Sequence, residues 1–552
     1  MKARLLAGRR RSALGALASL VILLGCVACG DDGDTGAGGT TATPSTGAEG
    51  SPSAGGTDDA APSDVDRDGV LRFVTAPSSG GHQLDPADTS INSDEAWLFM
   101  IYGTPLREAA SGALEPWLAE SVEVVDGSTV KLRLREGVTF SDGTPYDAAA
   151  LRRGMLRNLN EPGSPIVHAQ RNFAFRELEE IRVDGPLELT FLLKSAVAGE
   201  FLSVLAGREA TVPSPASLDA GVDPSTEPVG AGPYVLAEHR PEQLLSLRRN
   251  ESFIDANRWP LGGIDWVYAA PGAPTVNAIL GGHADAGPIA YADAATFRGN
   301  GAHEVVLVHR DFDYYVFNFC RTKPPFDDIN VRRALQMALD REAINAGLIG
   351  GEGEVAYGFW PEGHRYFDDD LRRYAERDVE EAKRLLAAAG ASNLEFDLVQ
   401  PVAAGGQVTR LSEIVQGQLA EVGVTANLLF LPTFVADFIT PQRPGVLMNP
   451  GSRTGTDRVA TLFRAGSIQA LCGSSDEQIM GWANEIAAMS PDDPRVPELW
   501  AQIEQRNAEQ AFVLFLVKVP TAYTFDTDRV GGTPQFSGQR GTILFESVYI
   551  RA

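Results

Sequence analysis

The chain has 552 residues, several times the roughly 100 to 200 residues of a single domain, so more than one hydrophobic core is expected. Hydrophobic residues make up 44% of the sequence, which excludes a wholly disordered chain. The formal net charge is −26, and a field of that sign repels phosphate backbones and anionic lipid headgroups. Composition therefore predicts a large globular protein that does not bind nucleic acid.

The first 25 residues have the organisation of a bacterial lipoprotein signal peptide. A basic segment, 1–11, leads into an apolar stretch, 13–24, that is too short to span a bilayer comfortably. Two leucines and a glycine stand directly before Cys26, and this pattern resembles the lipobox, in which the cysteine thiol is alkylated by a diacylglycerol. We therefore predict a signal peptide over 1–25 and lipidation at Cys26. Cys29 is a second candidate, and an ordinary cleaved signal with incidental cysteines is the alternative interpretation.

Residues 26–63 are rich in Gly, Thr, Ser, Ala, Pro and Asp and contain almost no large apolar side chain. Such a segment cannot offset its ordering entropy by burial, so it is predicted to be a disordered tether. No later segment has the roughly 18 uninterrupted apolar residues that a membrane-spanning helix needs. These features predict a protein that the N-terminal lipid holds on the extracytoplasmic face of the cell membrane.

From residue 70 to residue 309, short strand patterns alternate with short helix patterns. The predicted strands are 70–74, 129–135, 187–193, 234–236, 244–247, 264–268 and 304–309. The predicted helices are 95–102, 147–159, 200–206 and 275–280. The alternation of strands and helices predicts mixed α/β layers.

After residue 314 the predicted helices become longer, and two of them are followed by strand patterns. The helices are 329–344, 379–389, 407–422, 476–489 and 495–511, and the strands are 395–399, 426–431 and 512–519. In the first of these helices, Val331, Leu335 and Leu339 are predicted to face the core. Arg332 and Arg333 are predicted to lie on its exposed face.

Cys320 and Cys472 are the only cysteines beyond the N-terminal region. An extracytoplasmic compartment is oxidising, which favours a disulfide between them. Two buried free thiols are the equal alternative, because the sequence cannot supply the Cα separation that a disulfide requires.

The sequence lacks the motifs of the common enzyme chemistries. It contains no G-x-S-x-G nucleophile elbow, no H-E-x-x-H zinc motif and no P-loop. The 7 histidines are scattered without the i, i+3 or i, i+4 spacing of metal ligands. We therefore predict no catalytic residue, no metal site and no cofactor.

A series of short motifs runs through the first two thirds of the chain. The motifs are 84–86, 101–106, 114–121, 134–145, 228–234, 249–250, 324–328 and 331–341. Their order and spacing resemble the extracellular solute-binding proteins of peptide and nickel ABC importers, called solute-binding protein family 5. The strongest motif is 134–145, which is similar to the signature strand and turn of that family.

The resemblance implies a two-lobed type II periplasmic-binding-protein fold of the α/β class, with an extra subdomain in lobe I. Residues 64–309 and 520–552 would form lobe I, with the extra subdomain at about 105–225, and residues 312–518 would form lobe II. The lobes of such a fold close on a ligand by hinge motion. The implied function is capture of a solute by a monomer and its delivery to an ABC permease and its ATPase.

Ligand-binding residues are expected where polar and aromatic side chains meet between the lobes. The candidates are Ser90, Asn92, Tyr314, Tyr315, Asn318, Trp360, Asn449, Arg453 and Asp457. Many peptide binders of the family hold the peptide ammonium with an aspartate in a short D-P segment, and here Asp457 is the only acid in the comparable stretch, 449–457. Arg453 is expected to pair either with a ligand carboxylate or with Asp457.

An oligopeptide is the leading ligand class, followed by a sugar oligomer, an opine-like compound or a metal chelate. Two other functions stay open on the sequence alone. One is a lipid-anchored hydrolase on an α/β scaffold, which turnover without an importer would support. The other is a sensor or adhesion lipoprotein that kept the fold and lost transport.

Overall fold

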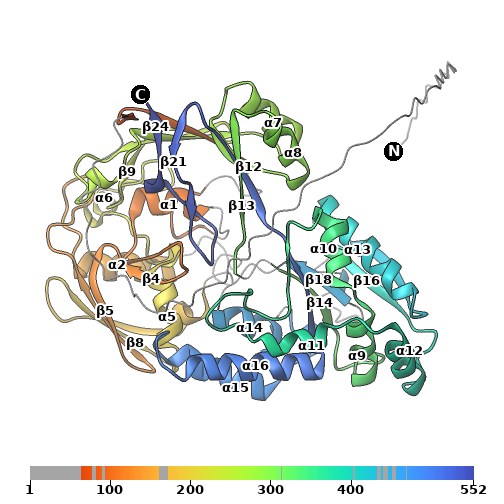
Figure 1. Ribbon diagram of the computed structural model, residues 1–552. Helices are drawn as coiled ribbons and strands as arrows, with labels where there is room; N and C mark the ends of the chain where they lie inside the picture. Colours follow the sequence, from red (N-terminus) through yellow and green to blue (C-terminus); the bar gives the residue numbers. More distant parts are fainter. Residues whose placement is uncertain are drawn as a thin grey trace, which may run out of the picture. The chain divides into compact units, whose positions relative to one another are not determined.

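The computed structural model describes residues 64–76, 83–89, 94–160, 172–311, 314–401, 405–431, 437–438, 446–450, 455–467 and 469–552 (Figure 1). The predicted signal peptide, Cys26 and the tether lie outside the described residues. Within the described ranges, no helix has the length and apolar character to cross a bilayer.

A seven-stranded sheet forms the centre of the first lobe. Its strand order is β13-β20-β12-β2-β11-β10-β9. The strands are β2 (Val70–Thr75), β9 (Tyr234–Arg240), β10 (Leu244–Arg249), β11 (Gly263–Tyr268), β12 (Ala286–Ile289), β13 (His303–Val308) and β20 (Thr521–Asp526). The late strand β20 lies between β13 and β12 and runs antiparallel to both. Helices α1 (Glu95–Tyr102), α7 (Ala273–Leu280) and α8 (Ala294–Arg298) belong to this lobe (Figure 1).

An additional antiparallel sheet of four strands extends the first lobe. Its order is β5 (Ala119–Asp126), β6 (Thr129–Leu134), β8 (Glu188–Leu193) and β7 (Leu178–Val183), and α2 (Ala148–Asn160) and α5 (Ala198–Leu205) accompany it. In β6 the side chains of Val130, Leu132 and Leu134 are buried and those of Lys131 and Arg133 are exposed. The strict alternation read from the sequence therefore reflects a sheet with one buried face.

The second lobe is built on a six-stranded sheet, in the order β15-β19-β14-β18-β16-β17. The strands are β14 (Tyr314–Phe319), β15 (Glu354–Val355), β16 (Glu395–Pro401), β17 (Thr425–Leu431), β18 (Val446–Pro450) and β19 (Val513–Lys518). All six residues of β14 are buried, because helices cover both faces of the sheet.

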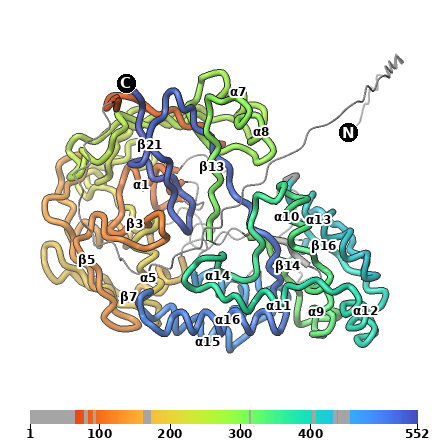
Figure 2. Tube along the Cα trace, viewed as in Figure 1, coloured from red at the N-terminus to blue at the C-terminus, as the bar shows by residue number. Residues whose placement is uncertain are grey.

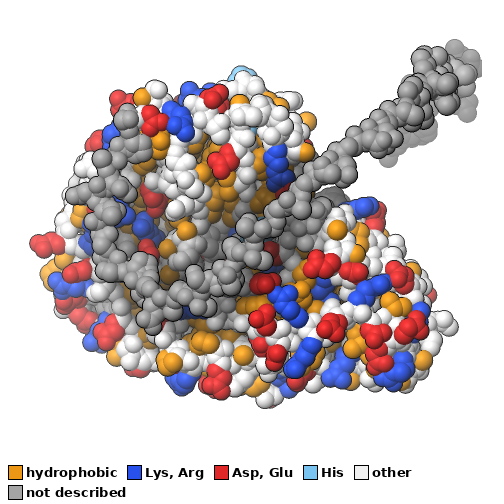
Figure 3. Space-filling model, viewed as in Figure 1, with side chains coloured by type: hydrophobic (Ala, Val, Ile, Leu, Met, Phe, Trp, Pro, Cys, Tyr) orange, Lys and Arg blue, Asp and Glu red, His pale blue; other side chains and the backbone are white. Residues whose placement is uncertain are grey.

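The helices of the second lobe divide between the two faces of its sheet. One group comprises α9 (Ile329–Ala338), α10 (Arg341–Ile349), α12 (Val379–Ala388) and α13 (Gly405–Ala420), and the other comprises α14 (Gly455–Phe463), α15 (Glu477–Ala488) and α16 (Val496–Gln510). On the face of the molecule in Figure 3, acidic and basic side chains are interspersed over this lobe. The predicted mixed α/β class is confirmed.

Short elements complete the chain. They are β1 (Val65–Asp66), β3 (Leu106–Glu108), β4 (Leu114–Pro116), α4 (Phe173–Arg176), α6 (Pro215–Asp219), α11 (Arg372–Ala375), β21 (Val530–Gly532), β22 (Gln535–Phe536), β23 (Ile543–Leu544) and β24 (Val548–Arg551).

The chain crosses between the two large sheets twice, from β13 to β14 and from β19 back to β20. Both crossings join the same two pairs of strands, because β13 pairs with β20 and β14 pairs with β19 (Figure 2). A pair of short crossings is the arrangement from which hinge motions arise.

Two sequence predictions in the second lobe are wrong. The expected helix 329–344 is two helices, because Asp340 caps α10 by accepting the backbone N–H of Ala343 at 2.9 Å. Arg332 is buried rather than exposed, since its guanidinium donates to the carbonyl oxygens of Phe326 at 2.8 Å and Gln510 at 2.9 Å.

Candidate ligand-binding site

Tyr314 and Asn318 lie on the face of β14 that α14 covers. The Tyr314 ring packs edge-on against Phe515, with ring centroids 4.7 Å apart. The Asn318 Nδ2 donates to the carbonyl oxygen of Gln469 at 2.7 Å. Because side chains alternate along a strand, Tyr315 points to the opposite face, where its hydroxyl donates to Gln407 Oε1 at 3.3 Å. The structure thus brings together Tyr314 and Asn318 and separates Tyr315 from them.

Arg458 extends from the first turn of α14 toward β14. Its side chain is 0% exposed, and its guanidinium carbon lies 5.5 Å from the centre of the Tyr314 ring. Its Nη1 donates to Gln469 Oε1 at 2.6 Å. Gln469 therefore links Arg458 to Asn318, and we call these three residues the Arg458 cluster.

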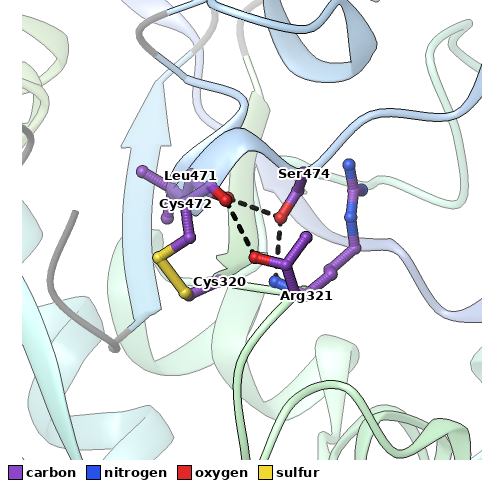
Figure 4. Close-up of a disulfide and its surroundings, with 6 residues drawn as sticks. Cys320, Arg321, Leu471, Cys472 and Ser474 are labelled. Carbon is purple, nitrogen blue, oxygen red and sulfur yellow. Dashed lines mark hydrogen bonds between the residues drawn. A yellow bond between two sulfur atoms is a disulfide. The ribbon is translucent and has the colours of Figure 1, made fainter.

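A disulfide joins Cys320 to Cys472, with the Cα atoms 5.2 Å apart. Ser474 forms hydrogen bonds with the residues next to both cysteines (Figure 4). Its hydroxyl accepts the backbone N–H of Arg321 at 2.9 Å and donates to the carbonyl oxygen of Leu471. Cys320 follows Asn318 by two positions, and Cys472 follows Gln469 by three. The bridge therefore restrains both chain segments that supply the Arg458 cluster.

The first turn of α14 also contacts the first lobe. Thr456 donates its hydroxyl to Glu200 Oε2 at 2.6 Å, while Asn172 and Ser203 lie within hydrogen-bond distance of the other Glu200 oxygen, at 3.4 Å and 3.1 Å. Burial and the neighbouring Asp457 carboxylate raise the pKa of Glu200 to about 7. The Thr456–Glu200 hydrogen bond thus joins the two lobes, and Thr456 precedes Arg458 by two positions.

Close packing accompanies this contact. A Cβ atom on Gly199 would lie 1.7 Å from the carbonyl oxygen of Met489. The backbone of α5 therefore contacts the backbone at the end of α15 directly, with no side chain between them. The Arg464 guanidinium stacks 4.8 Å from the centre of the Phe173 ring. The face of the second lobe that carries the Arg458 cluster is therefore the one that meets the first lobe.

Trp360 and Asp457 are both buried in the second lobe. Trp360 lies in the same apolar cluster as Tyr314, stacked on His364 at 4.1 Å and edge-on to Trp500 at 5.0 Å. Asn449 lies in β18, where its backbone pairs with Val316. Ser90, Asn92, Arg453 and the side chain of Asn449 lie outside the described residues.

The sequence analysis missed Arg458, Gln469, Glu200 and Thr456. No local signal pointed to Arg458, because Asp457 beside it on α14 is also charged and Gly455, Thr456 and Thr461 are not apolar. Among the described residues, no group of three or more His, Cys, Asp or Glu side chains could hold a metal ion.

Comparisons with known proteins agree with this architecture. The family model of the bacterial extracellular solute-binding proteins, family 5 Middle, matches residues 113–445. The glutathione-binding protein GsiB of Escherichia coli strain K12 is 27% identical over 358 residues, which are 64% of this chain and 68% of GsiB.

Solved structures share the whole fold. HbpA2 from Haemophilus parasuis superposes with a TM-score of 0.75 at 20% identity, over 88% of this chain and 100% of that one. NikA from Brucella suis in complex with Fe(III)-EDTA superposes with a TM-score of 0.74 at 22% identity, over 87% of this chain and 99% of that one. These matches confirm the predicted two-lobed periplasmic-binding-protein fold.

A family model that covers more than half of the chain decides between a binding protein and an enzyme. The chain is a solute-binding component of an ABC importer rather than a hydrolase. It belongs to the bacterial extracellular solute-binding proteins of family 5.

Proposed function

We propose that this protein is a lipid-anchored, monomeric binding protein that captures an oligopeptide between its lobes and delivers it to an ABC permease and its ATPase. The observation that carries the proposal is the position of the Arg458 cluster. It lies on the face of the second lobe whose neighbouring residue, Thr456, bonds to Glu200 of the first lobe at 2.6 Å. A ligand held by the cluster would be enclosed by closure of the lobes.

The proposed lobes are those expected from the sequence: 64–309 with 520–552 for lobe I, including the subdomain at about 105–225, and 312–518 for lobe II. The seven-stranded sheet supports this division, because it takes β20 from the late segment and all its other strands from residues before 309. The two crossings would then be the hinge.

A peptide ligand is supported by what several relatives bind. GsiB is named as a glutathione-binding protein, MppA as a murein tripeptide-binding protein, and AppA of Bacillus subtilis was solved with a nonapeptide. Other similar structures hold Ni(L-His) or agropinic acid, so the chelate and opine alternatives belong in the test.

Thermal unfolding of the full chain, purified in detergent, tests the function. The probes are di- to pentapeptides, glutathione, sugar oligomers, opines and metal chelates. A ligand present at about a hundred times its Kd stabilises the folded state by about 2.7 kcal/mol, which raises the melting temperature by several degrees. Mass spectrometry of the recovered ligand must show it unchanged; a consumed ligand, or no shift with any probe, contradicts the proposal.

Lipid anchoring at Cys26 is tested separately in growing bacteria. The Cys26→Ser variant is expected to lose incorporation of a labelled fatty acid and to leave the membrane fraction, because no acyl chain then supplies its roughly 0.8 kcal/mol per buried CH₂. The Cys29→Ser variant is the matched control and should stay lipidated. Loss of the label in Cys29→Ser alone would move the anchor to Cys29.

A further inference from the structure

A hydrogen bond between two side chains joins α14 of the second lobe to α5 of the first. Thr456, which is 3% exposed, donates to Glu200 Oε2 at 2.6 Å. A Cβ atom on Gly455 would lie 3.4 Å from the same oxygen. Glu200 as a whole residue is only half-buried, but both of its carboxyl oxygens have protein partners. Separation of the lobes would therefore expose this carboxyl group to water.

The hydrogen bonds at the other carboxyl oxygen fit a protonated Glu200. Ser203 Oγ lies 3.1 Å from Glu200 Oε1, but it lies closer, at 2.7 Å, to the carbonyl oxygen of Glu200. A hydroxyl has one hydrogen, and the shorter contact takes it. Asn172 Nδ2 donates to Ser203 Oγ at 3.0 Å and lies farther from Oε1, at 3.4 Å. The second lone pair of Ser203 Oγ is therefore left to accept the proton of a carboxylic acid.

The charged groups around Glu200 also favour its protonated form. Burial first and the Asp457 carboxylate of α14 second raise the pKa of Glu200 to about 7. Arg540 of the first lobe approaches from another side, but its guanidinium forms ion pairs with Glu95 and Glu108. Among the described residues, Glu200 itself forms no ion pair. A negative charge on Glu200 would therefore lie next to Asp457 without a cation of its own.

Glu209 also faces this group, and it differs from Glu200 in an instructive way. Its Oε1 accepts the backbone N–H of Asn172 at 3.1 Å and lies 3.8 Å from Arg208 Nε. Both of these partners belong to the first lobe, so they stay with Glu209 when the lobes separate. Glu200, in contrast, has Thr456 as a partner from the second lobe.

We propose that the Thr456–Glu200 contact is a proton-dependent latch, in which closure of the lobes on a ligand takes up one proton at Glu200 and loss of this proton favours the open arrangement. With the lobes closed, a deprotonated Glu200 lies beside a second carboxylate, away from water. With the lobes open, water solvates Glu200 and Asp457 moves away with the second lobe. This inference rests on the proposed importer function and adds that acidic surroundings favour capture of the ligand, while neutral or basic ones favour its release.

Isothermal titration calorimetry of the full chain tests the latch, with a peptide found by the thermal screen. The pKa of Glu200 is about 7 with the lobes in contact and is lower when they separate, so closure is favoured at low pH. The Kd is expected to rise by about 10-fold or more from pH 5 to pH 8. At pH 6, titrations in two buffers of different ionisation enthalpy should show uptake of roughly half to one proton per ligand.

The Glu200→Gln variant imitates the protonated form, because its amide can donate to Ser203 and accept from Thr456. It should lose the pH dependence and the proton uptake, and at pH 8 it should bind the peptide about 10-fold more tightly than the unaltered protein. A side chain that only fills space at the contact would weaken binding at both pH values when replaced. Glu179→Gln, at an exposed position of β7, is the matched control and should keep the pH dependence.

Amide hydrogen exchange of the full chain tests the latch without any ligand. At pH 8, residues 198–205 and 455–463 should exchange more slowly in Glu200→Gln than in the unaltered protein, because the variant keeps the two helices in contact. At pH 5 the two proteins should exchange alike, since the unaltered Glu200 is then protonated.

The outcomes separate the latch from the importer function. A Kd that does not change with pH, or that changes equally in Glu200→Gln, overturns the latch and leaves the importer function standing. Binding of no probe at all overturns the importer function, and hydrogen exchange then decides the latch. Equal exchange of the two proteins at pH 8 overturns it.

Discussion

The buried charges of this protein are set by tertiary contacts rather than by local sequence. Arg332 and Arg458 both belong to helices, and helix periodicity alone predicts an exposed side chain for such residues. Arg332 is buried because it reaches the end of α16, and Arg458 because α14 is covered on all sides. Neither cause is visible within one helical segment, so site residues of this kind are beyond prediction from the sequence.

Glu200 makes the stability of the protein depend on pH. Its folded pKa is raised to about 7 from an ordinary value of 4.5, by burial first and Asp457 second. The folded state therefore holds this proton more tightly, and the stabilisation is complete below about pH 4.5 and is lost as the pH rises through about 7.

The Glu200→Gln variant is expected to remove that dependence. Relative to the unaltered protein it should gain free energy of unfolding between pH 5 and pH 8, by about 3 kcal/mol at most. Urea unfolding at both pH values measures the difference. Glu179→Gln, at an exposed position of the same subdomain, should leave the pH dependence as it is; identical behaviour of the two variants would contradict the assignment.

Most elements with a strong pattern were predictable, and the weak ones were not. The strand at 129–135 and the helix at 379–389 match β6 and α12 within one residue, because their apolar positions follow one clean period. β12 and β20 were missed: β12 has only four residues, and in β20 the adjacent Thr524 and Phe525 are both buried, which breaks the alternation. The prediction of one helix over 329–344 was wrong at Asp340, because the side chain of Asp340 caps a new helix within an otherwise continuous apolar pattern.

Helices α5 and α15 meet where the two lobes are in contact, and each carries a glycine. We expect the same substitution, glycine to alanine, to have opposite effects at these two positions. A Cβ on Gly199 would meet the Met489 carbonyl at 1.7 Å, whereas nothing lies within 4 Å of a Cβ on Gly481 of α15. Gly199→Ala should therefore force α5 and α15 apart and weaken ligand binding by roughly 10-fold or more. Gly481→Ala should stabilise the protein by roughly 0.5–1 kcal/mol. Thermal unfolding with and without ligand measures both effects.

The disulfide acts on both stability and the site. It links residues that are 152 positions apart, and closing a loop of that size is expected to contribute about 2–5 kcal/mol. The double variant Cys320→Ser, Cys472→Ser should lose that stability in guanidinium unfolding. It should also bind peptide more weakly, because Asn318 and Gln469 lose their restraint. Unchanged affinity in the folded variant would show that the bridge serves stability alone.

At the scale of the whole molecule, the first lobe is discontinuous in sequence. Its sheet needs β20, which supplies the only neighbour of the edge strand β13 in that sheet. The two-lobed arrangement came from the family resemblance, because nothing in the local pattern of 521–526 indicates a partner more than two hundred positions earlier.

A fragment of residues 64–311 is therefore expected not to fold, since β13 and β12 lack the strand between them. The same residues joined by a short glycine-serine linker to 519–552 should fold. Near-ultraviolet circular dichroism and cooperative urea unfolding distinguish the two fragments. Cooperative unfolding of 64–311 alone would contradict this division of the molecule.

The late arrival of β20 also determines when the chain becomes folded. Pairing across so large a separation in sequence is slow, because the loop must close before any contact rewards it. During synthesis, β13 lacks its neighbour in the sheet and β12 has only β2 beside it until residues 521–526 have been made, so the sheet of the first lobe remains incomplete while most of the chain is already present. The central sheet of the first lobe is therefore completed only when nearly all of the chain has been made.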